Sequence, residues 1–156
     1  MQTRLDPFAT ELGPRFGRYI VSASKVVADS TLPATTRELV KIRASQINRC
    51  GGCLDMHTKD AAQAGETQVR LNLVAAWRET TVFTDAERAA LELTEQGTRL
   101  ADTGRVTDDA WADAARSFDE EQLMAIVCQI AVINAFNRLN VITEQRGGSY
   151  VPGQYD

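Results

Sequence analysis

Signals that begin a helix recur along the whole chain, and this recurrence restricts its fold more than any other feature. Thr84 is followed three residues later by Glu87, the capping-box pattern in which two side chains bond the free N–H groups of a first helical turn. Thr107 and Asp119 stand in the same way before two further helical patterns. No segment combines the alternation and turn residues of a β-hairpin. The sequence therefore predicts an all-α protein.

The periodicity divides the chain into about seven helices. We expect them at about 14–29, 36–47, 53–64, 68–79, 85–101, 107–116 and 120–145. A capping box of Thr35 and Glu38 would open the second, and the last is apolar nearly all round, as is typical of a central or interface helix. The tail after Gly147 should be irregular. No repeat, low-complexity segment or boundary is visible, so residues 1–156 should form one domain.

Size and charge exclude several classes of protein. A chain of 156 residues with 44% hydrophobic residues can bury a core without metal or disulfide staples. Its net charge of −4 provides no attraction to nucleic acid. The start of the chain has no signal-peptide pattern, which indicates the reducing cytoplasm. The apolar stretch Leu123–Phe136 contains Gln129 and Asn134 and is too short and polar to cross a membrane.

The chemistry is concentrated in the segment from Cys50 to His57, which holds two of the three cysteines and the only histidine. If Cys53 begins a helix, His57 lies one turn further on the same face. Cys50 and Cys53 are close enough in sequence for a reversible disulfide. The free N–H groups of a helix start and a nearby imidazole would both lower the pKa of a thiol. The segment therefore predicts a redox-active dithiol.

Other interpretations of these residues stay open at this point. A structural disulfide would be unusual in a reducing compartment. A zinc site built from Cys50, Cys53 and His57 lacks a fourth ligand, and His57 could be a buried core histidine. Cys128 lies among apolar residues and is expected to be an unreactive buried thiol.

Glu38 has two interpretations that the local pattern does not separate. It could be the capping-box partner of Thr35, or it could orient His57 and stabilise the charged imidazole. Basic residues flank the dithiol in sequence, and a solvated face is the default expectation for them, although any one could help to hold a thiolate. They are Lys41, Arg43, Arg49 and Lys59.

The spacing Glu38-x11-Cys50-x2-Cys53-x3-His57 resembles the AhpD-like alkylhydroperoxidase core of the carboxymuconolactone decarboxylase superfamily. Further segments that look like this family lie at 38–48, 55–61, 76–79, 83–89 and 133–139 and cover most of residues 32–144. The resemblance implies an all-helical domain that assembles as a trimer or hexamer. It also implies peroxide reduction by the cysteine pair, with no metal or organic cofactor.

The resemblance implies a role for each candidate residue. Cys53 corresponds to the peroxidatic cysteine and Cys50 to the resolving one, while His57 and Glu38 correspond to a proton relay that reaches Cys53 through water. The implied partners are a peroxide and a dithiol donor, such as a lipoyl or thioredoxin-like protein. The well-studied AhpD enzymes have a histidine where this chain has Gly52, so their particular donor, a lipoylated acyltransferase subunit, is not implied.

A second class of function uses the same cysteines. True carboxymuconolactone decarboxylases lack the cysteine pair, so its presence argues against decarboxylation. The alternative to a peroxidase is a non-catalytic oligomeric module that senses redox state or binds metal. Such a module has no need for Glu38 beside His57, and this placement separates the two hypotheses.

Overall fold

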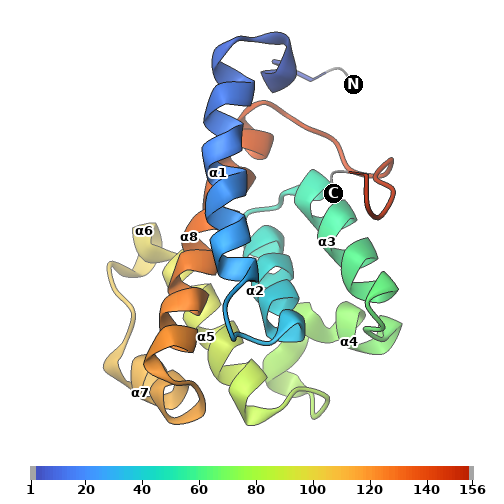
Figure 1. Ribbon diagram of the computed structural model, residues 1–156. Coiled ribbons are helices and arrows are strands. Elements are labelled where there is room, and N and C mark those ends of the chain that lie inside the picture. The colour runs from blue at the N-terminus through green and yellow to red at the C-terminus, as the bar shows by residue number, and fades with distance from the viewer. Residues whose placement is uncertain (1–2, 155–156) are drawn as a thin grey trace.

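The computed structural model describes residues 3–154, and no strand occurs in that range. Figure 1 shows the resulting all-helical arrangement. The α-helices are α1 (Leu12–Ala28), α2 (Ala34–Ile47), α3 (Gly51–Gln63), α4 (Gln68–Leu73), α5 (Asp85–Thr98), α6 (Leu100–Thr103), α7 (Asp108–Ser117) and α8 (Glu120–Ile142). Two 3₁₀ helices, η1 (Pro7–Ala9) and η2 (Val74–Glu79), complete the described elements. The all-α prediction is confirmed.

Helix α2 lies at the centre and packs against α3, α5 and α8 (Figure 1). Its successive side chains enter different parts of the core, because Val40 packs with apolar residues of α5, α7 and α8, whereas Leu39 and Ile42 pack with α5 and η2. A third, small cluster at the end of α2 consists of Ala44, Cys50, Cys53 and Ile133. The core of the domain therefore fixes the helix that leads directly into the cysteine pair.

Three predicted helix starts are confirmed. Thr84 and Glu87 form the expected capping box at α5, and Asp119 forms a second one with Gln122 at α8. The Thr107 side chain accepts from the N–H of Ala110 at the start of α7. In each case a side chain satisfies a backbone N–H that the first turn leaves free.

The capping box predicted for Thr35 and Glu38 is wrong. Helix α2 begins at Ala34 after Pro33, and no side chain caps it. Thr35 therefore lies inside the first turn, where its backbone is already helical, and Glu38 is free to take other partners.

The helix predicted to begin at Cys53 starts two residues earlier, with Cys50 as its N-cap and Gly51 as its first residue. Cys50 takes the extended backbone of a cap, which lets both glycines enter the first turn. Cys53 is consequently the third residue of α3.

Other predicted helices were too long. The helix expected over 68–79 ends at Leu73 and continues as η2, where the φ of −117° at Ala76 interrupts it. The helix expected over 85–101 ends at Thr98, and α6 follows separately. Helix α8 ends at Ile142 rather than near 145, since Glu144 adopts a φ of 57° that no α-helix continues.

Helix α8 is, within the described chain, long and apolar enough to cross a membrane by length and composition. One face of it fills the core with Ile126, Ile130 and Ile133. Only 28% of its most apolar stretch is buried in the single chain. A substantial apolar face of α8 is therefore left uncovered by this chain.

Candidate active site

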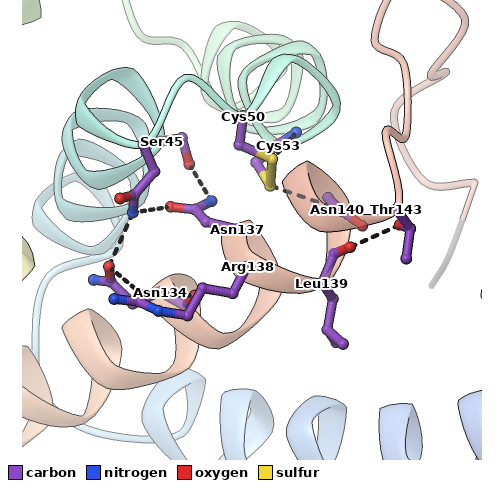
Figure 2. The surroundings of a disulfide bond; sticks show 10 residues. Ser45, Cys50, Cys53, Asn134, Asn137, Arg138, Leu139, Asn140 and Thr143 are labelled. Atoms are coloured by element: carbon purple, nitrogen blue, oxygen red, sulfur yellow. Dashed lines mark hydrogen bonds between the residues drawn. A yellow bond between two sulfur atoms is a disulfide. The ribbon is translucent and has the colours of Figure 1, made fainter. Parts of the chain in front are cut away.

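A network of buried side-chain amides holds the turn between α2 and α3 against α8 (Figure 2). The Asn48 Nδ2 donates to the side-chain oxygens of both Asn134 and Asn137, each at 2.9 Å. Asn137 in turn donates to the Ser45 hydroxyl at 3.0 Å. Arg49 completes the turn with a φ of 57°. The network thus ties the residues that precede the cysteine pair to a helix more than 80 residues away in sequence.

The two cysteines of the pair form a disulfide, with 5.4 Å between their Cα atoms. Cys50 caps α3, and its Sγ accepts the backbone N–H of Cys53 at 3.4 Å. The exposed fractions of Cys50 and Cys53 are 1% and 4%. The sulfurs therefore lie at the positive end of a helix, which favours a thiolate, whereas their burial opposes one.

Glu38 of α2 faces His57 of α3, and the Oε2 and Nδ1 atoms are 3.3 Å apart. Both atoms are buried, and they do not align as a hydrogen bond, nor does either have another such partner within residues 3–154. The other carboxylate oxygen accepts from the Lys41 ammonium at 2.7 Å. The structure therefore brings together two residues of the predicted site that are 19 positions apart.

The charge on Glu38 is set by these neighbours. Burial opposes ionisation, but the His57 imidazole and the Lys41 ammonium outweigh it and lower the pKa of Glu38 to about 2. At neutral pH the residue is a carboxylate, which can stabilise a proton on the imidazole beside it. Of the two interpretations of Glu38, the structure shows the contact with His57 and not the cap.

Asn140, on α8, is the residue at the site that sequence analysis missed. Its Nδ2 donates to the Cys53 Sγ at 3.3 Å, as the dashed line in Figure 2 shows. The available signal was the spacing of Asn134, Asn137 and Asn140 by three residues in an otherwise apolar helix, which places polar groups on neighbouring faces.

The segment after α8, residues 143–154, packs over the start of α3. The N–H groups of Gly148 and Tyr150 both donate to the Asp55 carboxylate, at 2.5 and 3.0 Å. Gly147 lies so close to Gly51 that a Cβ at position 147 would be 2.3 Å from the Gly51 carbonyl oxygen. This C-terminal segment, irregular as predicted, therefore packs against the first turn of α3, which follows Cys50.

Three of the four basic residues near the pair have carboxylate partners, and Arg49 is exposed. Lys41 binds Glu38, Lys59 binds Asp55, and Arg43 binds the buried Glu95. The solvated face expected for them is wrong for Arg43 and Lys41, whose side chains are only 12% and 17% exposed.

The third cysteine lies away from the pair, in α8. Cys128 is a free, partly buried thiol that packs against the main core cluster. Among residues 3–154, no group of three or more histidine, cysteine, aspartate or glutamate side chains is arranged to hold a metal ion.

The fold and this arrangement define an all-helical protein with a buried disulfide at the start of α3 and a glutamate–histidine pair one turn further along that helix. The chain belongs to the carboxymuconolactone decarboxylase family, whose model matches residues 14–96. It is 39% identical over 139 residues to YdfG, an uncharacterized protein of Bacillus subtilis (strain 168), covering 89% of this chain and 94% of that one. It is also 32% identical over 111 residues to YnjA, an uncharacterized protein of Escherichia coli (strain K12), covering 71% and 60%.

Solved structures share the fold. A protein of unknown function from Agrobacterium tumefaciens, proposed to be the antioxidant defence protein AhpD, superimposes with a TM-score of 0.88 at 32% identity, covering 96% of this chain and 100% of that one. A debrominase in complex with 2,3,4-tribromopyrrole superimposes with a TM-score of 0.77 at 17% identity, covering 87% and 72%. The second likeness supports the fold alone.

Proposed function

We propose that this protein is a thiol-dependent hydroperoxide reductase of antioxidant defence. The observation that carries the proposal is the Glu38–His57 contact, which lies one helical turn along α3 from Cys53 of the Cys50–Cys53 pair. A peroxidase needs a thiolate and a group that moves its proton, and these four residues supply both. The similarity to the Agrobacterium protein supports the same class of activity.

The first half of the reaction oxidises Cys53. His57 takes the thiol proton, through the water that the family resemblance implies, and Glu38 stabilises the resulting imidazolium. The Cys53 thiolate then attacks the terminal peroxide oxygen. The O–O bond breaks, an S–O bond forms, and the departing alkoxide takes the proton from His57 and leaves as an alcohol. Cys53 is left as a sulfenic acid.

The second half regenerates the dithiol. The Cys50 sulfur attacks the sulfenic sulfur, which forms the Cys50–Cys53 disulfide and releases water. A dithiol donor of the lipoyl or thioredoxin-like class then reduces this disulfide by two thiol exchanges and is itself oxidised to a disulfide. The chemistry requires no metal or organic cofactor, and it suits a reducing compartment such as the cytoplasm.

A turnover assay tests the proposal. We expect cumene hydroperoxide to be consumed catalytically with dihydrolipoamide or a thioredoxin system, and Cys53→Ser to abolish the activity. A protein that oxidises once and does not turn over with any of these dithiols would instead be the redox-sensing module that uses the same cysteines. Zinc bound stoichiometrically by the reduced protein would favour the metal-binding alternative.

We further propose that the protein is a homo-oligomer, a trimer or a hexamer, assembled through α1 and α8. Tyr19 and Val26 of α1 and Met124 of α8 are 75%, 73% and 56% exposed in the single chain, and exposed apolar patches of this kind mark interfaces. A second copy is the occupant that the family resemblance supports for this face, rather than a membrane. Light scattering at micromolar concentration should give a multiple of 17.1 kDa, and a monomeric mass would contradict the proposal.

A further inference from the structure

We propose that Asn140 is a further catalytic residue, whose side-chain amide holds Cys53 as a thiolate and makes it, rather than Cys50, the reactive sulfur. The inference rests on the proposed function for its role in turnover. Its structural basis is the donation from the Asn140 Nδ2 to the Cys53 Sγ at 3.3 Å.

The two sulfurs of the pair each accept one N–H group. Cys50 accepts the backbone N–H of Cys53 at 3.4 Å and stands at the N-cap of α3. The helix terminus alone would therefore stabilise negative charge on Cys50. Cys53 accepts its N–H from a side chain of a different helix, α8. Asn140 is thus a group that, in addition to the proposed His57 relay, offsets the advantage of Cys50.

The side-chain amide of Asn140 can face Cys53 favourably in one orientation only. Neither a disulfide sulfur nor a thiolate carries a proton to donate, so the amide nitrogen and not the amide oxygen must face Cys53. A hydrogen bond to a charged acceptor is stronger than one to a neutral acceptor. The contact therefore strengthens when Cys53 becomes a thiolate, which lowers the pKa of the thiol.

The nearby cations are engaged elsewhere. Lys41 pairs with Glu38 and Lys59 pairs with Asp55. Among residues 3–154, Asn140 is the side chain that donates to a sulfur of the pair. A neutral amide provides this N–H at every pH at which the protein is folded.

The position of Asn140 is fixed from two sides. One turn earlier on α8, the fully buried Asn137 is bonded to both Ser45 and Asn48, which locks the helix to the turn before Cys50. On the other side Gly52 has no side chain, and a Cβ there would make an ordinary van der Waals contact of 4.0 Å with the Asn140 Nδ2. The amide therefore reaches the sulfur without a competing group at position 52.

The same contact directs the reduction of the disulfide. A donor thiolate attacks Cys50, a new S–S bond forms between donor and Cys50, and the Cys50–Cys53 bond breaks with its electron pair on Cys53. The Asn140 N–H stabilises this leaving thiolate, and a thiol of lower pKa leaves faster. The second thiol of the donor then attacks the donor sulfur, which releases Cys50 as a thiolate and the donor as a disulfide.

The test uses the intact chain with the substitution Cys50→Ser, which keeps a good N-cap and removes coupling between two thiols. In this background we compare Asn140, Asn140→Ala and the near-isosteric Asn140→Asp, with the exposed Asn72→Ala of α4 as control. The readout is the alkylation rate of Cys53 against pH, resolved for each cysteine by mass spectrometry. Thermal unfolding confirms that each variant is folded.

We expect the pKa of Cys53 to rise by about one unit in Asn140→Ala and further in Asn140→Asp. At neutral pH the thiolate fraction would then fall roughly tenfold, with Asn72→Ala unchanged. An unchanged pKa in the aspartate variant, or an equal change in Cys128 reactivity, would overturn the inference. Because the readout is a thiol titration, a peroxidase assay that fails while the shift is present would contradict the proposed function and not the role of Asn140.

Discussion

The half-buried Glu38 of α2 and the buried Glu95 of α5 are both held as carboxylates, but by different kinds of partner. Glu95 accepts from Arg43, Trp77 and Arg78 at 2.7–2.8 Å, and none of these donors loses its proton in the physiological range. Glu38 has one oxygen on Lys41, and its other oxygen faces the titratable His57 without an aligned hydrogen bond.

The difference distinguishes a structural carboxylate from one that can take part in proton transfer. For both residues burial opposes ionisation, yet the partners prevail and the pKa is lowered. At Glu95 the partners never change state, so the arrangement holds η2 and α2 to α5 and does nothing else. At Glu38 the partner can gain and lose a proton, and the carboxylate favours the protonated form of His57. Equivalent substitutions at the two positions should therefore have different consequences.

The largest expected effect is the loss of peroxidase rate in the Glu38→Gln variant. Loss of the negative charge removes the support for a protonated His57, and loss of a general acid–base relay costs ~10²–10⁴ in rate. We expect the variant to remain folded at the assay temperature but to be less stable, because a buried charged contact is lost. Steady-state peroxidase kinetics beside a thermal unfolding curve measures both effects.

A Glu38→Gln protein with the rate of the wild type would show that the carboxylate is structural, as Glu95 is. It would also leave His57 without an assigned partner.

The second largest effect is on the stability of Glu95→Gln. Removal of this charge leaves Arg43 buried without its carboxylate, and breaking a buried pair from one side costs about 3 kcal/mol or more. Chemical denaturation should show a lower midpoint for Glu95→Gln than for Glu38→Gln. Below its unfolding temperature, the Glu95 variant should retain the peroxidase rate of the wild type. A Glu95→Gln variant that loses peroxidase rate without losing stability would contradict the structural role of Glu95.

A smaller effect concerns the C-terminal segment, residues 143–154, which packs over the start of α3. In Gly147→Ala the new Cβ would overlap the Gly51 carbonyl, and overpacking of about 1 kcal/mol would open the C-terminal segment about fivefold more often. Reduction of the disulfide by dithiothreitol should accelerate by that factor. The matched control is Gly17→Ala in α1, where a Cβ meets nothing within 4 Å. Equal reduction rates in the two variants would show that the segment does not limit access.

The smallest effect is the acid dependence of Glu38. Its carboxyl titrates at 4.5 when unperturbed and at about 2 in the folded protein. The stability that ionised Glu38 contributes is therefore present above pH 4.5 and is lost as the pH falls toward 2. The difference in Tm between wild type and Glu38→Gln should shrink over this range, while contributions from Glu95 cancel because both proteins retain it. A difference that is constant with pH would contradict the shifted pKa.

Much of the fold followed from local signals. Thr84, Thr107 and Asp119 begin helices as predicted because a cap acts within one turn and needs no distant partner. The helix predicted over 68–79 is interrupted at Ala76, and nothing in the local sequence predicts this break. The η2 helix that follows brings Trp77 to Glu95, which is 18 residues away in sequence.

The site was predictable only where its spacing is local or matches a known family. The cysteine pair and His57 lie on one helix, and sequence alone placed them near its start. The contact of Asn140 with Cys53 joins residues 87 positions apart, and no pattern within α8 identifies which of its asparagines reaches the sulfur.

The most direct measurement is the oxidation of prereduced protein by one equivalent of cumene hydroperoxide, with the modified cysteines identified by mass spectrometry. We expect the peroxide to produce the Cys50–Cys53 disulfide and to leave Cys128 as a thiol. In the Cys50→Ser variant, dimedone should label Cys53 as a sulfenic acid. A sulfenic label on Cys128 in place of Cys53, or a reaction no faster than that of a free thiol, would contradict the assignment of Cys53 as the residue that attacks peroxide.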